Sequence, residues 1–436
     1  MSPASQHAPS SADVVIIGSG AAGLATAIFT AQTAQELGIR KPRICILDGA
    51  RVVGAKILVA GGGRCNVTHL CASESDFQGS SHFVRNILRS FGIEDARAWF
   101  ASMSVLLKEE DTGKLFPVTD DAKTVLNALL SRMGELGVQL YTQHRVIDIK
   151  HDGDFVITHS HGTMRAKIMV MATGGKSLPK SGSDGAGWEM VKKLGHTVTN
   201  TYPALVALVL QNGFFHTHLS GVSLPVELST WVCATQGNNQ AAGPKSRRDQ
   251  RTGEMLFTHT GISGPVAMDA SRFWIIARAH GEAPEVRCNF FPGEDFAAVE
   301  KWLLQQAAGN PQRSILRCAS ERLPKNVATH LIEYCNIDPA KEMGQLTREH
   351  RRQLVHAFTA LVLPITGDRG WNHAEVTAGG VPLEEVNFRT MASNHVPGLF
   401  LTGEILDCEG RIGGFNFQWA WATGYVAGTA IGKLLS

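Results

Sequence analysis

Several features that would place this chain in a membrane or outside the cell are missing. No stretch of the 436 residues reaches the roughly 18 consecutive apolar residues of a membrane span. The eight cysteines are scattered without a CxxC pair, which argues against a disulfide framework or a cysteine zinc site. Residues 1–12 lack the basic and apolar regions of a signal peptide and predict a disordered tail. We therefore expect a cytoplasmic protein with no membrane partner and no bound metal.

The chain also lacks a strong excess of charge. The chain has 41 Lys and Arg residues and 39 Asp and Glu residues, so its net charge is +2. This value neither indicates nor excludes a nucleic-acid partner. Apolar residues make up 44% and charged residues 18%, as in compact globular proteins. The length exceeds what one hydrophobic core usually needs and predicts two or three domains.

A β-α-β unit is predicted at the start of the chain. Asp13–Ile17 is a short apolar run typical of a buried parallel strand, and Ala21–Leu37 is an Ala-rich segment typical of a helix. Arg43–Asp48 has the pattern of the next buried strand. This order favours an α/β fold with a parallel sheet.

The turn between the first strand and the helix reads GSGAAG, a dinucleotide-binding fingerprint. Gly18 would make the tight turn, Gly20 would let a pyrophosphate approach the backbone, and Gly23 would let the helix pack closely on the strand. The pyrophosphate would then lie at the helix N-terminus, where free N–H groups and the helix dipole favour anions. Asp48, at the end of the second strand, is placed to accept hydrogen bonds from ribose hydroxyls. The fingerprint alone does not distinguish FAD from NAD.

The segment after the second strand adds a second glycine cluster. Gly61–Gly63 would let the backbone pass close to a flat ring, and no regular helix or strand carries three glycines easily. Lys56, Arg64 and Asn66 supply hydrogen-bond donors for a phosphate or for the edge of a flavin.

At this point the chain resembles a known family, the HI0933-like flavoproteins, also called the BaiN/RdsA family of FAD-dependent oxidoreductases. The resemblance begins with the stretch GAKILVAGGGRCNVT and continues in order to the C-terminus. The other motifs that carry it are Lys114–Lys123, Ala172–Gly175, Gly182–Gly195, Leu256–Pro265, Val376–Val386 and Gly403–Ala420.

The pattern along the chain predicts one Rossmann-like cofactor domain that is formed by both chain ends and interrupted by two insertions, and the resemblance implies that its cofactor is FAD. We expect a tail at 1–12, the first part of the FAD-binding domain at 13–203 and its second part at 360–436. Between them we expect a small β domain at 204–292, where short β-like stretches alternate with turns, and a helical module at 293–359.

The FAD is expected to contact the N-terminal β-α-β unit, the glycine-rich segment after it, the strand end near Ala172 and the C-terminal motif. The expected cofactor-binding residues are Gly18, Gly20, Ala21, Ala22, Gly23, Asp48, Gly49, Lys56, Gly62, Gly63, Arg64, Cys65, Asn66, Val146, Ala172, Thr173, Gly174, Gly403, Glu404, Asp407, Gly413, Gly414, Phe415 and Asn416.

The C-terminal motif has a predicted role at the flavin ring. Gly413–Asn416 lead into the last predicted helix, so their N–H groups can face the N1/O2 edge, where reduced flavin is anionic. Asp407 is placed to bind the ribityl chain or the pyrophosphate. Cys408–Ile412 reads CEGRI, where the family usually shows D-G-x-T, so the contacts at the ring edge are expected to differ here.

The catalytic candidates are Cys65, Arg64 and His259, with His69 as a further proton-donor candidate. Cys65 either supplies a proton or a redox thiol, or simply packs a tight loop, and its spacing to Cys71 does not make a CxxC dithiol. Each histidine has the alternative of a hydrogen-bonded structural role. A reductase acting on a polarised double bond needs such a proton donor.

The resemblance implies a reductase that passes hydride from NADH or NADPH through FAD to an activated C=C bond. Two substrate classes are implied, a uridine of 23S ribosomal RNA and a small unsaturated carbonyl compound such as an oxo-steroid, and we favour the RNA. A non-catalytic flavin-dependent redox or RNA-binding protein is the alternative. The basic stretches Lys245–Arg251 and Arg348–Arg352 would contact RNA phosphate or form solvated faces. Only one GxGxxG is present, so the sequence shows no separate site for the nicotinamide, which would bind transiently. The oligomeric state is left open.

Overall fold

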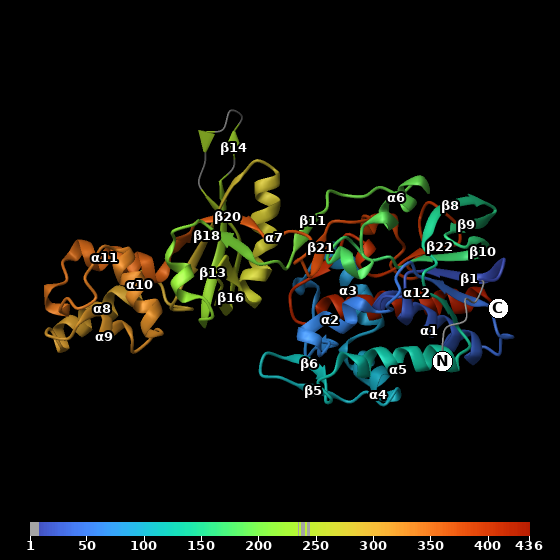
Figure 1. Ribbon diagram of the computed structural model, residues 1–436, viewed down its shortest axis with the longest axis horizontal. Coiled ribbons are helices and arrows are strands. Elements are labelled where there is room, and N and C mark those ends of the chain that lie inside the picture. Colours follow the sequence, from blue (N-terminus) through green and yellow to red (C-terminus); the bar gives the residue numbers. More distant parts are fainter. Residues whose placement is uncertain (1–7, 234, 237–239, 242–244) are drawn as a thin grey trace. The chain divides into compact units, whose positions relative to one another are not determined.

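The computed structural model describes residues 8–233, 235–236, 240–241 and 245–436. The chain forms two compact units (Figure 1). Unit 1 contains residues 1–203 and 375–436, and unit 2 contains residues 204–374. Most of the tail predicted at 1–12 lies outside the described residues, and the first strand already begins at Ser11.

The core of unit 1 is a mostly parallel sheet built from both chain ends, which confirms the predicted α/β fold. Strand β22 from the C-terminal part pairs with β10 from the N-terminal part, through Met169–Met171 and Leu399–Leu401. The sheet reads, in spatial order, β7 (Gln139–Tyr141), β2 (Ile44–Leu47), β1 (Ser11–Ile17), β10 (Gly162–Met171), β9 (Asp154–His159) and β8 (Val146–Asp152), with β22 (Leu399–Leu401) also on β10.

Helices α1 (Ala21–Glu36) and α12 (Phe415–Leu434) lie side by side in unit 1 (Figure 1). Glycines on α12 make this approach close: a Cβ on Gly424 would lie 2.7 Å from the Ala25 Cβ, and one on Gly428 would lie 2.6 Å from the Phe29 Cβ. Such separations are shorter than van der Waals contact, so the two helices pack at a distance that only glycine allows. The last helix of the chain thereby stabilises the helix of the N-terminal β-α-β unit.

The remaining elements of unit 1 surround this sheet and the two helices. The helices are α2 (Ala55–Gly63), α3 (Ser81–Ser90), α4 (Ile93–Ser102), α5 (Ala122–Glu135) and α6 (Ala186–Lys193), with short η1 (Glu74–Asp76), η2 (Pro179–Ser181), η5 (Leu383–Glu385) and η6 (Gly403–Ile405). The short strands are β3 (Thr68–His69), β4 (Phe77–Gln78), β5 (Leu107–Glu109), β6 (Lys114–Pro117), β11 (Tyr202–Ala204), β21 (Val376–Ala378) and β23 (Glu409–Gly410).

Unit 2 combines an antiparallel sheet with helices. Its sheet reads β19 (Leu361–Leu363), β18 (Ala283–Asn289), β13 (Ser223–Cys233), β16 (Ser246–Phe257), β17 (Gly261–Ser263), β12 (Leu208–Leu210) and β20 (Ile365–Asp368). Its other elements are α7 (Pro265–Ala279), α8 (Phe296–Gly309), α9 (Ile315–Ala319), α10 (Lys325–Tyr334), α11 (Arg348–Thr359), η3 (Phe215–Leu219), η4 (Met343–Gln345), β14 (Thr235–Gln236) and β15 (Gln240–Ala241).

The structure adds two details to the predicted insertions. Helix α7 interrupts the segment that we expected to be a β domain and packs on β13 and β16. Strands β19 and β20 lie beyond residue 360 but pair with β18 and β12, so we group residues 360–374 with unit 2. A short apolar strand does not encode which sheet it joins, because that choice depends on partners far away in the chain.

Candidate cofactor-binding site

The glycine turn between β1 and α1 has the three-part geometry of a pyrophosphate-binding turn. Gly18 has φ +105°, and a Cβ there would lie 2.4 Å from the Ala172 carbonyl oxygen. A Cβ on Gly23 would lie 2.0 Å from the Gly18 carbonyl oxygen. Gly20 differs, since a Cβ there would meet nothing within 4 Å, and no described side chain caps the helix at this residue. The backbone at Gly20 is therefore open for an anionic ligand at the N-terminus of α1.

Asp48 lies directly beside this turn at the end of β2. Its Oδ2 accepts hydrogen bonds from the Ser19 backbone N–H at 2.7 Å and the Ser19 hydroxyl at 2.5 Å, and its Oδ1 accepts one from the Ala50 N–H at 2.7 Å. These bonds hold the carboxylate next to the turn, as a ribose-binding residue requires. The next residue, Gly49, has little space for a side chain, because a Cβ there would lie 2.8 Å from the Arg145 Cδ.

The segment after the first glycine cluster meets the second cluster in space, although about 350 residues separate the two in the sequence. A Cβ on Gly414 would lie 2.6 Å from the Thr68 carbonyl oxygen and 2.8 Å from the Asn66 Oδ1. The Thr68 hydroxyl donates to the Gln418 Oε1 at 2.8 Å. The loop after α2 and the N-terminus of α12 thus form one wall of the site.

The glycine loop itself belongs to the last part of α2, where regular helix geometry breaks. Gly61 and Gly62 have left-handed φ angles of +58° and +71°. A Cβ on Gly62 would meet nothing within 4 Å, so a ligand can approach the backbone there. Helical structure over Ala55–Val59 was not anticipated, because the glycines dominate the pattern of this segment.

An ion pair joins two further predicted residues across the site. The Lys56 Nζ lies 2.7 Å from the Glu404 Oε2 and 2.7 Å from the Ser177 Oγ. The Glu404 Oε1 accepts hydrogen bonds from the Ser177 hydroxyl at 2.9 Å and the Thr377 N–H at 2.9 Å. Ser177 and Thr377 were missed from the sequence, although Ser177 lies two residues after the predicted Ala172–Gly175 motif.

Three buried polar atoms in or directly beside the predicted cofactor segments test whether the site fits FAD. Within the described residues, the Asn66 Oδ1, Thr173 Oγ1 and Thr402 Oγ1 have no hydrogen-bond partner. An unpaired buried polar atom costs roughly 1–3 kcal/mol, so such atoms usually indicate a missing polar partner. Polar groups of a bound dinucleotide would satisfy them, and with the open backbone at Gly20 and Gly62 the residues fit the cofactor.

The C-terminal motif is held by its own side chains. Gly413 and Gly414 have φ +130° and +93°, and Gly414 caps α12. Asn416 bonds both backbone groups of Gly410, at 2.8 Å and 2.9 Å. The Arg411 Nη1 lies 3.1 Å from the Asp76 Oδ1. Two residues of the unusual CEGRI stretch, Glu409 and Gly410, form β23, which pairs with β4.

Three further residues that we expect to bind the cofactor are Asp407, Val146 and Gly174. The Asp407 Oδ2 accepts a hydrogen bond from the Thr199 hydroxyl at 2.9 Å. Val146 is the first residue of β8 and is buried opposite His159. A Cβ on Gly174 would lie 2.7 Å from the Ser183 Oγ.

The catalytic candidates differ sharply in their exposure. Cys65 is fully buried, and burial raises the pKa of its thiol to about 12. The Arg64 side chain is 37% exposed, its Nη1 lies 2.5 Å from the Glu110 Oε1, and its guanidinium lies over the Phe116 ring. His259 is exposed in the turn between β16 and β17 of unit 2. His69 stacks on Phe415 with ring centroids 4.7 Å apart.

Fold and site together define an FAD-binding protein of the Rossmann type. The chain matches the family model described as the HI0933-like protein Rossmann domain over residues 12–430. It therefore belongs to this family, and it is an FAD-dependent oxidoreductase. This confirms the resemblance that the motifs carry.

Similar proteins have named activities. The chain is 33% identical over 417 residues to a 3-dehydro-bile acid delta(4,6)-reductase of Clostridium scindens, covering 95% of this chain and 98% of that protein. It is 29% identical to ribosomal RNA dihydrouridine synthases of Haemophilus influenzae and Escherichia coli, covering 96% and 95% of this chain and 98% and 96% of those proteins. Among the described residues, no helix is long and apolar enough to cross a bilayer.

Proposed function

We propose that this protein is an NADH- or NADPH-dependent reductase of an activated C=C bond, with a uridine of 23S ribosomal RNA as its substrate. The named activities of its relatives support this chemistry. Both named activities, at 33% and 29% identity, are reductions of a C=C bond. Bound FAD would accept a hydride from the nicotinamide and pass it to one carbon of that bond.

The chain's own residues would bind and orient the cofactor. The turn at Gly18–Gly23 would hold the pyrophosphate at the N-terminus of α1, and Asp48 would hold the ribose. The amide groups at the N-terminus of α12 would face the ring and stabilise developing negative charge there, by up to about 2 kcal/mol. Asn66 would offer its Oδ1 as an acceptor to the same ligand.

The second carbon of the double bond needs a proton from the protein or from water. Arg64 is the candidate in unit 1 whose side chain is accessible, so we assign substrate contact to it. The Cys65 thiol is buried and stays protonated at neutral pH, so in this proposal it packs the loop that carries Arg64.

The preference for RNA over a small substrate rests on the surface of unit 2. Strand β16 begins with the exposed residues Ser246–Arg248, preceded by the exposed Lys245. The Arg247 and Arg287 guanidiniums lie 5.9 Å and 4.9 Å from the centre of the Trp231 ring, and Arg287 and Lys245 also form ion pairs with Glu285. Cations beside an aromatic ring are a common combination in RNA-binding surfaces.

Two experiments test the proposal in order. Anaerobic addition of NADH or NADPH to the purified yellow protein should bleach the flavin absorbance, and a spectrum unchanged by both nucleotides would refute the nicotinamide-linked reductase. Mass mapping of 23S ribosomal RNA from a deletion strain should show one uridine that is no longer reduced.

An unchanged dihydrouridine content would remove RNA as the substrate. If the nicotinamide still bleaches the flavin, a small unsaturated carbonyl compound becomes the substrate, and reoxidation of the reduced protein by a 3-oxo-4-ene steroid tests it. In the reductase, Arg64→Met should slow substrate reduction.

A further inference from the structure

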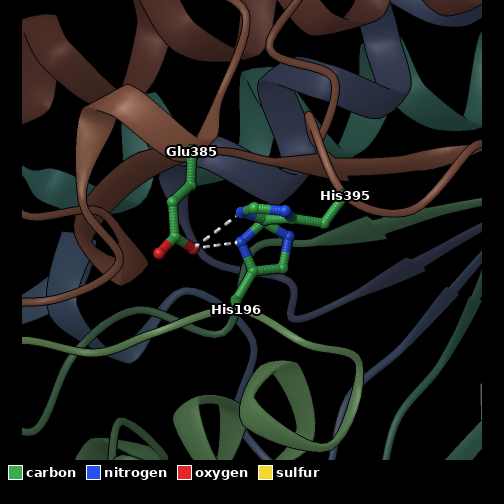
Figure 2. A group of neighbouring side chains, drawn as sticks. All are labelled: His196, Glu385 and His395. Atoms are coloured by element: carbon green, nitrogen blue, oxygen red, sulfur yellow. Dashed lines mark hydrogen bonds and ion pairs between the residues drawn. The ribbon is translucent and has the colours of Figure 1, made fainter.

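A histidine–glutamate cluster lies in unit 1, formed by residues that we do not assign to FAD. Figure 2 shows His196, Glu385 and His395 with their polar atoms directed toward one another. His196 follows α6, Glu385 ends η5, and His395 lies in the turn before β22. Nearly 200 residues separate His196 from its two partners, so the fold alone brings the three together.

The donor atoms have the chemistry and the spacing of a transition-metal site. The His196 Nδ1 lies 2.7 Å and the His395 Nε2 lies 3.6 Å from the Glu385 Oε2, and all three ligand atoms lie within 4.8 Å of one another. In a tetrahedral zinc site with bonds of roughly 2.0–2.1 Å, donor atoms are about 3.3 Å apart. The observed separations bracket this value, so small side-chain rotations suffice to admit an ion.

The surroundings of the cluster orient two of its members. The His196 Nε2 lies 2.8 Å from the Ser393 Oγ, which fixes the plane of the imidazole. The Glu385 carboxylate accepts hydrogen bonds from both the backbone N–H and the hydroxyl of Thr197. Outer-shell partners of this kind hold metal ligands in place and are a regular part of zinc sites.

The three side chains of the cluster differ in how much of their surface is exposed. The His196 side chain has no exposed surface, the Glu385 side chain is 14% exposed, and the His395 side chain is 44% exposed. The exposed edge at His395 gives an ion a way in and leaves a position for water.

We propose that His196, Glu385 and His395 bind a divalent transition metal of the zinc class, with water as the fourth ligand. Two imidazole nitrogens and one carboxylate oxygen form a ligand set that zinc uses. The metal would join the connection after α6 to the loop before β22, and β22 leads directly into Gly403 and Glu404. Its role would be structural. The competing arrangement is a plain hydrogen bond between His196 and Glu385, in which His395 has no part.

Titration with zinc alone separates these two arrangements. The FAD-containing protein is first treated with a chelator and dialysed, then titrated with Zn²⁺ in a calorimeter. We expect one tight site in the unmodified protein. In His395→Ala the affinity should fall at least by the roughly 10–100-fold that loss of an outer-shell partner costs. His151→Ala, which removes an exposed histidine of β8, should bind like the unmodified protein.

Stability provides the second measurement. Zinc should raise the unfolding temperature of the unmodified protein and of His151→Ala, but not that of His395→Ala. Retained yellow colour shows that a variant is folded, and His395→Gln replaces His395→Ala if the latter loses its FAD. Equal zinc affinity in the unmodified protein and both His395 variants, or no zinc-dependent shift in unfolding temperature, would overturn the metal site and leave the hydrogen bond.

Discussion

The Lys56 Nζ lies 2.7 Å from the Glu404 Oε2, although 348 residues separate the two in the sequence. Both side chains are mostly buried, with 25% and 20% of their surface exposed. Ser177 bonds both partners, so three distant parts of the chain meet at one ion pair. The pair ties the start of α2 to η6, which follows β22, and both segments belong to the candidate FAD site.

Breaking this pair should destabilise unit 1. We expect Lys56→Met and Glu404→Gln each to lower the free energy of unfolding by about 1–3 kcal/mol, because each leaves a charged or polar partner poorly solvated. Denaturant unfolding of both single variants and of the double variant measures the coupling between the two residues.

Lys192→Met is the control for the ion pair. Lys192 pairs with Glu189 on the surface of α6, with 46% and 72% of the side chains exposed, and exposed pairs contribute little. We expect a change within about 0.5 kcal/mol. A Lys56→Met effect no larger than this would show that the pair does not hold the segments together.

Gly20 and Gly23 should respond differently to substitution. Gly20→Leu should abolish FAD binding without unfolding the protein, because its Cβ meets no other atom within 4 Å and its φ of −76° suits any residue. Gly23→Leu should destabilise the fold itself, since its Cβ would lie 2.0 Å from a carbonyl oxygen. Flavin absorbance and circular dichroism measured on both variants separate loss of the ligand from loss of the fold. Full yellow colour in Gly20→Leu would remove the pyrophosphate from this turn.

Enlarging Gly428 should separate α12 from α1. A Cβ there would lie 2.6 Å from the Phe29 Cβ and 2.7 Å from the Thr26 carbonyl oxygen. Overpacking typically costs about 1–3 kcal/mol, so Gly428→Leu should lower the unfolding temperature by several degrees.

A glycine in another helix provides the comparison for Gly428. Gly134 lies in α5, and a Cβ there meets nothing within 4 Å. Gly134→Ala should leave stability unchanged or raise it by up to about 1 kcal/mol, since alanine favours helix. Unfolding temperatures that fall equally in both variants would argue against tight packing of α1 on α12.

The cysteines should differ in reactivity toward a maleimide. Cys71 is exposed, whereas Cys65 is buried and its pKa is raised to about 12. Because the thiolate is the reactive form, Cys71 should label rapidly at neutral pH and Cys65 should not. Mass spectrometry of labelled peptides measures both rates, and rapid labelling of Cys65 in the native protein would contradict its burial.

The same burial predicts a direction for the pH dependence of stability. The folded state keeps Cys65 protonated above the ordinary thiol pKa of about 8.5, while the unfolded state loses that proton. The unfolded state then binds fewer protons, so the free energy of unfolding should fall as the pH rises from about 8.5 toward 12. Cys65→Ala should reduce the slope in this range, and an unchanged slope would show that other groups cause it.

Most of what could be predicted from the sequence came from short contiguous motifs. The strand, turn and helix around Gly18–Gly23 lie within one short segment, so their pattern predicted these elements and the tight contacts at Gly18 and Gly23. The same holds for Gly413–Asn416 at the start of α12. Because such a motif depends on local backbone geometry, it identifies a Rossmann-type unit without knowledge of the rest of the chain.

Only the tertiary structure decided which distant residues meet. The contacts of Lys56 with Glu404, of Thr68 with Gln418 and of His196 with Glu385 join residues 348, 350 and 189 positions apart. No local pattern encodes these partners, since each side chain is equally compatible with other neighbours. The same reason explains why β19 and β20 joined the sheet of unit 2: pairing follows from the global packing of strands, which the sequence of a three- or four-residue strand does not specify.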